Sequence, residues 1–207
     1  MKNHEEQLAA IQEMRNMMDQ ATRFKSISGL SGMIAGILSL LSLYFVYLRT
    51  GISPFEAEAL DRIWHSSNHT QISYIFISLL AVCMGIGFYM SRRNARQAGK
   101  NAWDGSAKRL AFSLLIPVFV GGIFSVLLIQ LGLVALVAPV TLLFYGMGLL
   151  SASKFTLNAV YTVGLIFTGL GLLATGFLSY GLLIWALGFG LVHILYGFII
   201  YVKYERV

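Results

Sequence analysis

Two long runs without a charged side chain constrain the fold of this chain more than any other feature. Leu110 to Ser153 comprises 44 residues and Phe155 to Val202 comprises 48, and neither run contains Asp, Glu, Lys or Arg. Because one helical membrane crossing takes about 20 apolar residues, each run is long enough for two crossings. Two shorter apolar stretches precede them, at about 27–48 and 72–90. The sequence therefore predicts six transmembrane helices.

The composition agrees with a chain that dissolves in lipid. Of the 207 residues, 57% are hydrophobic and only 12% are charged, whereas about 25% of the residues of a soluble domain are charged. We predict an all-α integral membrane protein: a six-span transmembrane helix bundle with an N-terminal cytoplasmic amphipathic helix. The bundle occupies 27–207 and leaves no room for a second folded domain; its expected spans are about 27–48, 72–90, 110–130, 133–152, 156–177 and 180–202.

Residues 1–26 are polar and show no cleavable secretory signal, so we expect them to stay on the chain. Leu8, Ile11, Met14 and Met18 recur at steps of three and four, which predicts an amphipathic helix. Its apolar stripe needs a partner. The helix packs on the cytoplasmic face of the bundle, lies at the lipid surface, or pairs with a second subunit as a short coiled coil.

A polar break from Ser91 to Arg109 indicates the orientation of the bundle. It holds six basic residues against one acid, Asp104: Arg92, Arg93, Arg96, Lys100, Lys108 and Arg109. With the N-terminus inside, thirteen Lys and Arg lie on the cytoplasmic side and two outside, which fits the positive-inside rule and places both termini in the cytoplasm. The six are also candidate contacts for anionic lipid headgroups. We expect no nucleic-acid partner, because the basic residues flank apolar segments instead of forming a soluble basic face.

The loop between the first two spans has the sequence signature of a helix start. Ser53-Pro54-Phe55-Glu56 combines an N-cap serine, a first-turn proline and a capping-box glutamate, so we expect a short helix to begin there. If that helix continues through His69, one of its faces carries four side chains of the kinds that bind zinc: Glu58, Asp61, His65 and His69. If the polar run Ser66 to Asn68 ends the helix first, the same residues form a solvated polar face.

His193 is the single His, Asp, Glu, Lys or Arg within the six predicted spans. An ionisable group inside a membrane is a functional candidate by default. One hypothesis is a structural hydrogen bond to a hydroxyl on a neighbouring span, and the other is a ligand contact in a cavity among spans three, five and six. The residues expected to line that cavity are His193, Tyr196, Tyr161, Thr162 and Asn158. A haem with two histidine ligands would need a second histidine within the membrane.

Gly32 and Gly36 form a Gly-x-x-x-Gly step in the first span. Such a step lets a second helix backbone approach closely, which replaces the hydrophobic force that is missing in lipid. The step serves either packing within the chain or the seam of a homodimer.

Short motifs in the last third of the chain resemble a known group of proteins. They are Tyr145-Gly146, the segment Ser151-Ala152-Ser153-Lys154-Phe155-Thr156, the segment from Gly190 to Gly197 around His193, and the ending Lys203-Tyr204-Glu205-Arg206. These motifs are similar to those of uncharacterised small multi-span bacterial inner-membrane proteins. The resemblance implies the bacterial inner membrane as the location and implies no mechanism.

The missing motifs restrict the classes of function. The sequence has no glycine-rich phosphate loop, no serine nucleophile elbow and only one cysteine, Cys83. We expect no enzyme and no cofactor. The predicted function is that of a non-enzymatic multi-pass inner-membrane protein that acts by binding, as a subunit, scaffold or regulator. Its expected partners are membrane lipids, and in addition a second copy of the chain or another membrane protein. Two alternatives are a small permease or carrier of a neutral or lipophilic ligand with a cavity near His193, and a redox or metal protein that uses His193 or the outer histidines.

Overall fold

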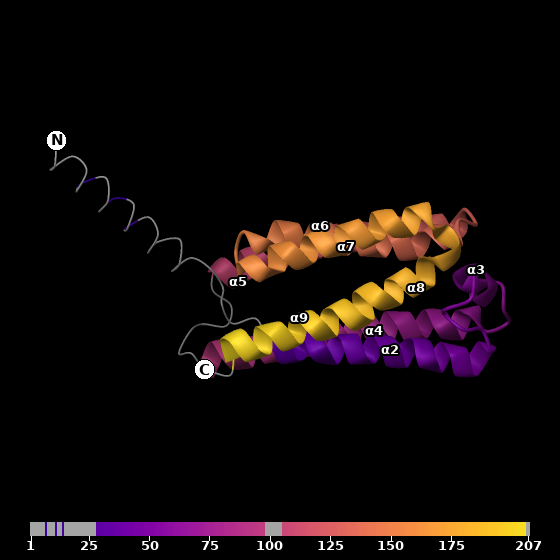
Figure 1. The fold of residues 1–207 in the computed structure, drawn as a ribbon, viewed down its shortest axis with the longest axis horizontal. Coiled ribbons are helices and arrows are strands. Elements are labelled where there is room, and N and C mark those ends of the chain that lie inside the picture. Colours follow the sequence, from indigo (N-terminus) through magenta and orange to yellow (C-terminus); the bar gives the residue numbers. More distant parts are fainter. Residues whose placement is uncertain (1–6, 8–10, 12–13, 15–27, 98–104, 206–207) are drawn as a thin grey trace.

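The computed structural model describes residues 7, 11, 14, 28–97 and 105–205 of the chain (Figure 1). Within this part every regular element is helical, and six helices are long and apolar enough to cross a membrane. They are α2 (Gly29–Thr50), α4 (His69–Gln97), α5 (Gly105–Gln130), the helix Val134–Ser153, α7 (Asn158–Gly176) and the helix Leu178–Lys203. The predicted count of six apolar helices is confirmed. The amphipathic helix expected over 1–26 lies outside the described residues apart from Gln7, Ile11 and Met14.

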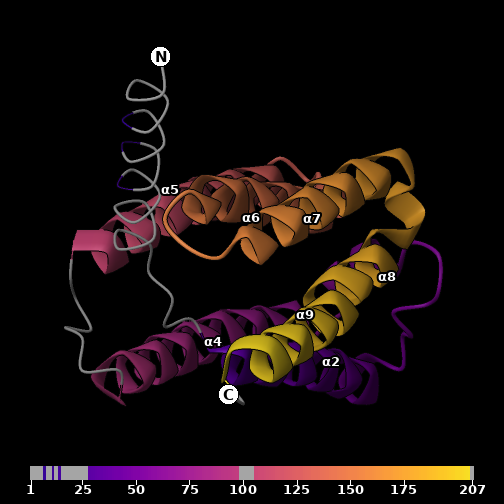
Figure 2. The same cartoon turned by 60° about the vertical axis from the view of Figure 1, so that its left-hand side comes forward.

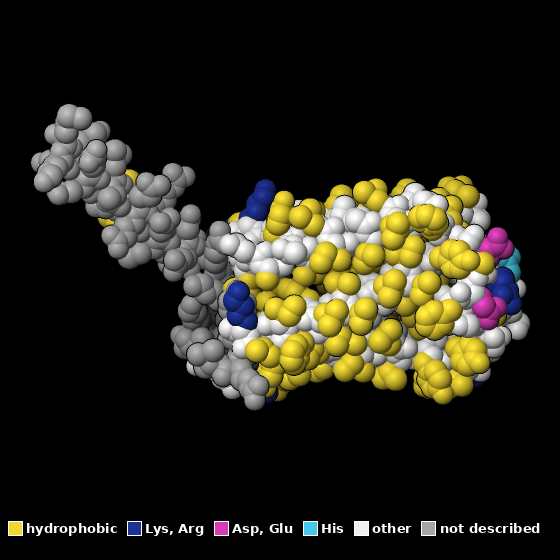
Figure 3. All heavy atoms as spheres, viewed as in Figure 1, with side chains coloured by type: hydrophobic (Ala, Val, Ile, Leu, Met, Phe, Trp, Pro, Cys, Tyr) yellow, Lys and Arg dark blue, Asp and Glu magenta, His cyan; other side chains and the backbone are white. Residues whose placement is uncertain are grey.

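The six long helices form two layers (Figures 1 and 2). One layer contains α5, α6 (Val137–Ser153) and α7, and α6 packs against both of the others. A short 3₁₀ turn, η1 (Val134–Leu136), directly precedes α6. The other contains α2, α4 and most of the last span. On the face of the molecule shown in Figure 3, hydrophobic side chains are spread along the length of the helices, while the charged ones gather at the two ends, as expected for helices that cross an apolar layer.

The last span connects the two layers. After the 3₁₀ turn η2 (Leu178–Tyr180), it comprises α8 (Gly181–Trp185), the π-helical segment η3 (Ala186–Val192), α9 (His193–Ile200) and a second π-helical segment, η4 (Tyr201–Glu205). Its first part, α8, packs on α6 and α7, whereas α9 packs on α2. The span therefore passes from one layer to the other as it crosses the molecule (Figure 2).

Glycines allow the close contact between α2 and the last span. A Cβ built on Gly36 would lie 2.6 Å from the carbonyl oxygen of Gly190, and one built on Gly197 would lie 2.5 Å from the backbone N of Met33. A Cβ on Gly32 would meet the Cα of Gly197 at 3.3 Å. Since lipid supplies no hydrophobic force between helices, such backbone contacts carry much of the packing. The Gly32–Gly36 step thus packs against the last span within the chain.

The polar break from 91 to 109 is more helical than a surface loop. α4 continues to Gln97 and α5 begins at Gly105, which leaves only 98–104 outside the described residues. Arg, Ala and Gln are good helix formers, so α4 extends beyond the apolar stretch expected at about 72–90. Arg92, Arg93 and Arg96 consequently lie on the last turns of a helix.

The loop between α2 and α4 folds over one end of the bundle. Glu56 Oε1 accepts the Ser53 N–H at 2.9 Å, as a capping box requires, yet the helix does not continue from that turn. Glu58 has φ 57°, and its N–H donates to the Ser179 carbonyl oxygen at 2.7 Å, so α3 covers only Ala59–Trp64. The expected start at Ser53 is therefore corrected to Ala59. Ile63 of α3 is buried in a cluster with Leu43, Val46, Ala59, Ile72 and Leu182.

Candidate functional site

A hydrogen bond inside the bundle joins the two layers at His193. The Tyr145 hydroxyl of α6 lies 2.9 Å from Nε2 of His193, and Nδ1 lies 3.4 Å from the carbonyl oxygen of Gly188. A carbonyl only accepts, so Nδ1 carries the proton and donates to Gly188, while Nε2 accepts from the Tyr145 hydroxyl. Both ring nitrogens of a neutral imidazole are therefore satisfied within the chain.

The π-helical segment η3 makes the second of these contacts available. Gly188 lies five residues before His193, the spacing of a π-helical turn. Gly188 is also closely packed, since a Cβ there would lie 2.7 Å from Cδ2 of Leu142 on α6. Single π-helical turns within α-helices are frequent at functional sites, and this one holds the imidazole in a fixed orientation toward α6.

Aromatic rings surround the pair. The His193 ring stacks on Phe189 at 5.6 Å between centroids and meets Phe167 of α7 edge-on at 5.1 Å. Trp185 lies against Phe189 at 4.8 Å, and Phe76 of α4 meets Trp185 edge-on at 5.6 Å. A continuous row of rings thus runs from α7 through the last span to α4. This apolar setting strengthens the hydrogen bonds of His193, because few water dipoles compete with them.

The structure separates the residues that were expected to line one cavity. Tyr196 packs against the core cluster that includes Phe167, and Tyr145 packs against the same cluster. In contrast, Asn158, Tyr161 and Thr162 are exposed on the outer side of α7, whereas that helix reaches His193 through the buried Phe167.

Sequence reasoning missed Tyr145 as the partner of His193. It predicted a hydroxyl on a neighbouring span but assigned no residue. The available signal was that Tyr145 is the only tyrosine in the uncharged run from Leu110 to Ser153.

The proposed metal-binding face of the outer loop is not assembled. α3 ends at Trp64, because the Ser66 hydroxyl donates to the Ile63 carbonyl oxygen at 2.6 Å and competes with further helical bonds. The imidazole of His65 lies 3.5 Å from the Asp61 carboxylate, but His69 turns to the Ser66 carbonyl oxygen at 3.2 Å. Within the described part of the chain, no three His, Cys, Asp or Glu side chains are grouped so that they could hold a metal ion. The prediction from Glu58, Asp61, His65 and His69 is corrected accordingly.

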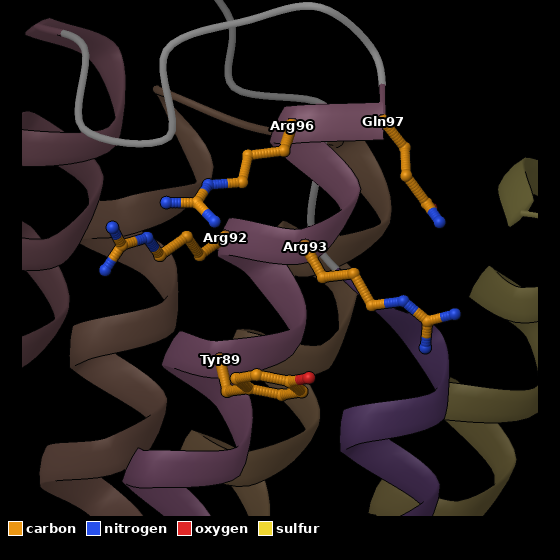
Figure 4. A pocket seen from close by; sticks show the side chains of 5 residues that line it. All are labelled: Tyr89, Arg92, Arg93, Arg96 and Gln97. Atoms are coloured by element: carbon orange, nitrogen blue, oxygen red, sulfur yellow. The ribbon is translucent and has the colours of Figure 1, made fainter.

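A second polar site lies at the end of α4. Arg92, Arg93 and Arg96 line a hollow of about 400 Å³ together with Tyr89 and Gln97 (Figure 4). Of the other three basic residues of the break, Lys108 and Arg109 lie on the first turns of α5, and Lys100 is outside the described residues. The Arg109 guanidinium lies over the Phe155 ring at 5.7 Å and donates to the Ser106 hydroxyl at 3.2 Å.

Comparison with protein-family models, with curated proteins and with solved structures gave no match.

Proposed function

We propose that this chain is a multi-pass protein of the bacterial inner membrane, with both termini in the cytoplasm, that acts by binding. Its role is that of a subunit, scaffold or regulator, and its partner is a transmembrane helix that packs on α4. The six apolar helices, the excess of Lys and Arg on one side and the resemblance of the C-terminal third support the location.

The exposure of α4 carries the proposal. Its most apolar window has a mean hydropathy of 2.0, close to the other spans, but only 6% of that window is buried inside the chain. The corresponding share is 17–44% for the other five helices. α4 packs mainly on α2 among its neighbours, so most of its surface is free for lipid or for a partner.

Small residues mark one exposed side of α4. Ser78, Ala81 and Gly85 follow each other at steps of three and four, and all three are exposed. A Cβ built on Gly85 would have nothing within 4 Å. Small residues at this spacing are typical of helix contacts in membranes, because they let backbones approach. This side of α4 is the surface that we assign to the partner helix.

The surroundings of His193 favour binding at the surface over transport through the centre. A carrier needs a cavity that reaches its ligand-binding groups, and two hollows of the described part lie at opposite ends of the molecule, beside Tyr89 and beside Trp64, away from His193. His193 also uses both ring nitrogens within the chain. The pair with Tyr145 then serves to tie the two layers together.

Native mass spectrometry of the full chain in lipid nanodiscs tests this proposal. We expect the wild type to carry a second membrane-protein chain, either another copy or a different one, and Gly85→Leu to lose it. Gly122→Leu is the matched control, since Gly122 of α5 is also an exposed helical glycine with nothing within 4 Å of a built Cβ. A monomeric wild type, or equal loss of the partner in both variants, would contradict the assignment to α4.

The carrier remains the second candidate, because a π-helical turn lies directly before His193. A carrier would retain a co-purified small molecule, and His193→Ala should reduce its occupancy. Unchanged occupancy in that variant would remove His193 from the ligand site.

A further inference from the structure

Three arginines at the end of α4 have no acidic partner among the described residues. Arg92, Arg93 and Arg96 are exposed and take part in neither of the two ion pairs found there. In the outer loop, by contrast, Arg62 pairs with the Glu56 carboxylate at 2.5 Å. The end of α4 therefore presents three positive charges within five residues of helix, none of them paired with an acid of the described part of the chain.

Arg92, Arg93 and Arg96 all line one hollow at the end of α4. In Figure 4, Arg92 and Arg96 extend to the same side of α4, Arg93 extends to the other side, and the Tyr89 ring lies one turn below them. These residues and Gln97 enclose about 400 Å³. A guanidinium offers a planar fork of N–H donors, which matches two oxygens of one phosphate group. Arg92 and Arg96 therefore present two such forks on one side of α4, and Arg93 presents a third on the other side.

An apolar surface continues from the hollow along α4. Tyr89 is 68% exposed and Met84 47%. A free phosphate ion has no apolar part that could contact such a surface, whereas the acyl chains of a lipid would lie along it. Tyrosine is also enriched at the depth of the headgroups, where its ring is in the apolar layer and its hydroxyl reaches water.

We propose that Arg92, Arg93 and Arg96 bind the phosphate of an anionic phospholipid, whose acyl chains run along α4 past Tyr89. The inference rests on the membrane placement proposed above and does not require a partner helix. Tyr89 lies one turn beyond Gly85, so the acyl chains would lie next to a helix bound at Ser78, Ala81 and Gly85. It differs from a general attraction of basic residues to the cytoplasmic surface, because it predicts that these three arginines contribute more than other basic residues at the same end.

The experiment uses the full chain in mild detergent, titrated with phosphatidylglycerol or with phosphatidylcholine and followed by native mass spectrometry. In Arg92→Gln/Arg93→Gln/Arg96→Gln we expect the affinity for phosphatidylglycerol to fall about a hundredfold, or roughly 3 kcal/mol at about 1.4 kcal/mol per tenfold, because the phosphate loses its charge-assisted hydrogen bonds to the guanidinium groups. The matched control is Lys108→Gln/Lys154→Gln/Lys203→Gln, which removes the same charge at the same end of the bundle. For it we expect a change of less than about threefold, since the sum of charges alone does not form the site.

A further variant separates charge from geometry. Arg92→Lys/Arg93→Lys/Arg96→Lys keeps all three charges and the positive-inside signal but loses the guanidinium forks, so we expect an intermediate loss of about tenfold. Melting curves show whether each variant is folded. If the triple Gln variant does not fold, the triple Lys variant still tests the proposal.

Four outcomes would overturn the proposal. Equal losses in the two Gln variants would indicate a diffuse basic rim, and equal binding of both lipids would indicate no recognition of an anion. Displacement of phosphatidylglycerol by millimolar inorganic phosphate would identify a free phosphate site. Displacement by an acidic peptide at comparable concentration would identify a protein partner. Failure of the membrane placement is detected separately, because the protein would then be released from membranes by alkaline extraction.

Discussion

α2 and α4 are neighbouring helices whose most apolar stretches have similar mean hydropathy, 1.9 and 2.0, yet they pack in opposite ways. In α2, Gly29, Gly32 and Gly36 all face the backbone of the last span. In α4, a Cβ built on Gly85 or Gly87 would have nothing within 4 Å. The two helices differ because the glycines of α2 contact Gly190 and Gly197 of the last span, whereas those of α4 contact no other helix among the described residues. A glycine in a membrane helix therefore indicates close packing only when the partner helix is known.

The largest expected difference in stability between the two helices comes from replacing one glycine of α2 and one glycine of α4 with alanine. Gly36→Ala would place a Cβ 2.6 Å from the Gly190 carbonyl oxygen and 3.0 Å from the Ile194 backbone N, and neither can move without shifting a helix. We expect a loss of about 1–3 kcal/mol in the free energy of unfolding, as for other overpacked sites. Unfolding in mixed detergent micelles measures it.

Gly87→Ala is the control for this prediction. A Cβ there meets nothing within 4 Å, and alanine is favoured over glycine within a helix by up to about 1 kcal/mol, so stability should stay constant or rise slightly. Similar losses for Gly36→Ala and Gly87→Ala would show that α4 is packed as closely as α2.

The sequence allowed the six helices to be predicted because mean hydropathy depends on composition alone. α4 continues to Gln97, beyond the apolar span expected at about 72–90, since the arginine-rich segment after Met90 has high helix propensity. The partner of His193 could not be assigned, because Tyr145 is 48 residues away and its approach depends on how α6 and the last span pack. The metal-binding face failed for a local reason, namely the Ser66 hydroxyl that ends α3.

The second prediction concerns the hydrogen bond between Tyr145 and His193, which joins the layer of α2 and α4 to the layer of α6. Tyr145→Phe keeps the ring contacts with Phe167 and Phe189 but removes the hydroxyl that donates to His193 Nε2. Side-chain hydrogen bonds within membrane bundles contribute about 0.6 kcal/mol on average and about 1.7 at most. We expect a loss within this range in the same unfolding assay.

A double-mutant cycle with His193→Phe isolates the pairwise contribution. Tyr161→Phe serves as the control, because Tyr161 is 52% exposed on the outer side of α7 and should tolerate the change. A coupling energy of zero between Tyr145 and His193 would show that their hydrogen bond does not stabilise the packing of the two layers. It would then favour a ligand-binding role for His193.

The smallest effect is expected at Glu56, in the loop that joins α2 to α4. The pKa of the Glu56 carboxyl is lowered because it accepts the Ser53 backbone N–H and, in addition, a hydrogen bond from Arg62. A group whose folded pKa is lowered stabilises the fold above its unfolded pKa of about 4.3, and this contribution disappears as the pH falls through the folded value. Glu56→Gln should therefore lower the melting temperature slightly at about pH 7 and leave it unchanged at pH values below the folded pKa.

Glu58→Gln is the matched control, because it changes the same kind of side chain two residues away and outside the Glu56–Arg62 ion pair. Melting curves of both variants and the wild type at several pH values measure the difference. If the two variants shift the melting temperature equally at neutral pH, the general charge of the loop is responsible and not the Ser53–Glu56–Arg62 contacts. A difference confined to Glu56→Gln at neutral pH would instead show that these contacts hold the loop between the closely packed α2 and the exposed α4.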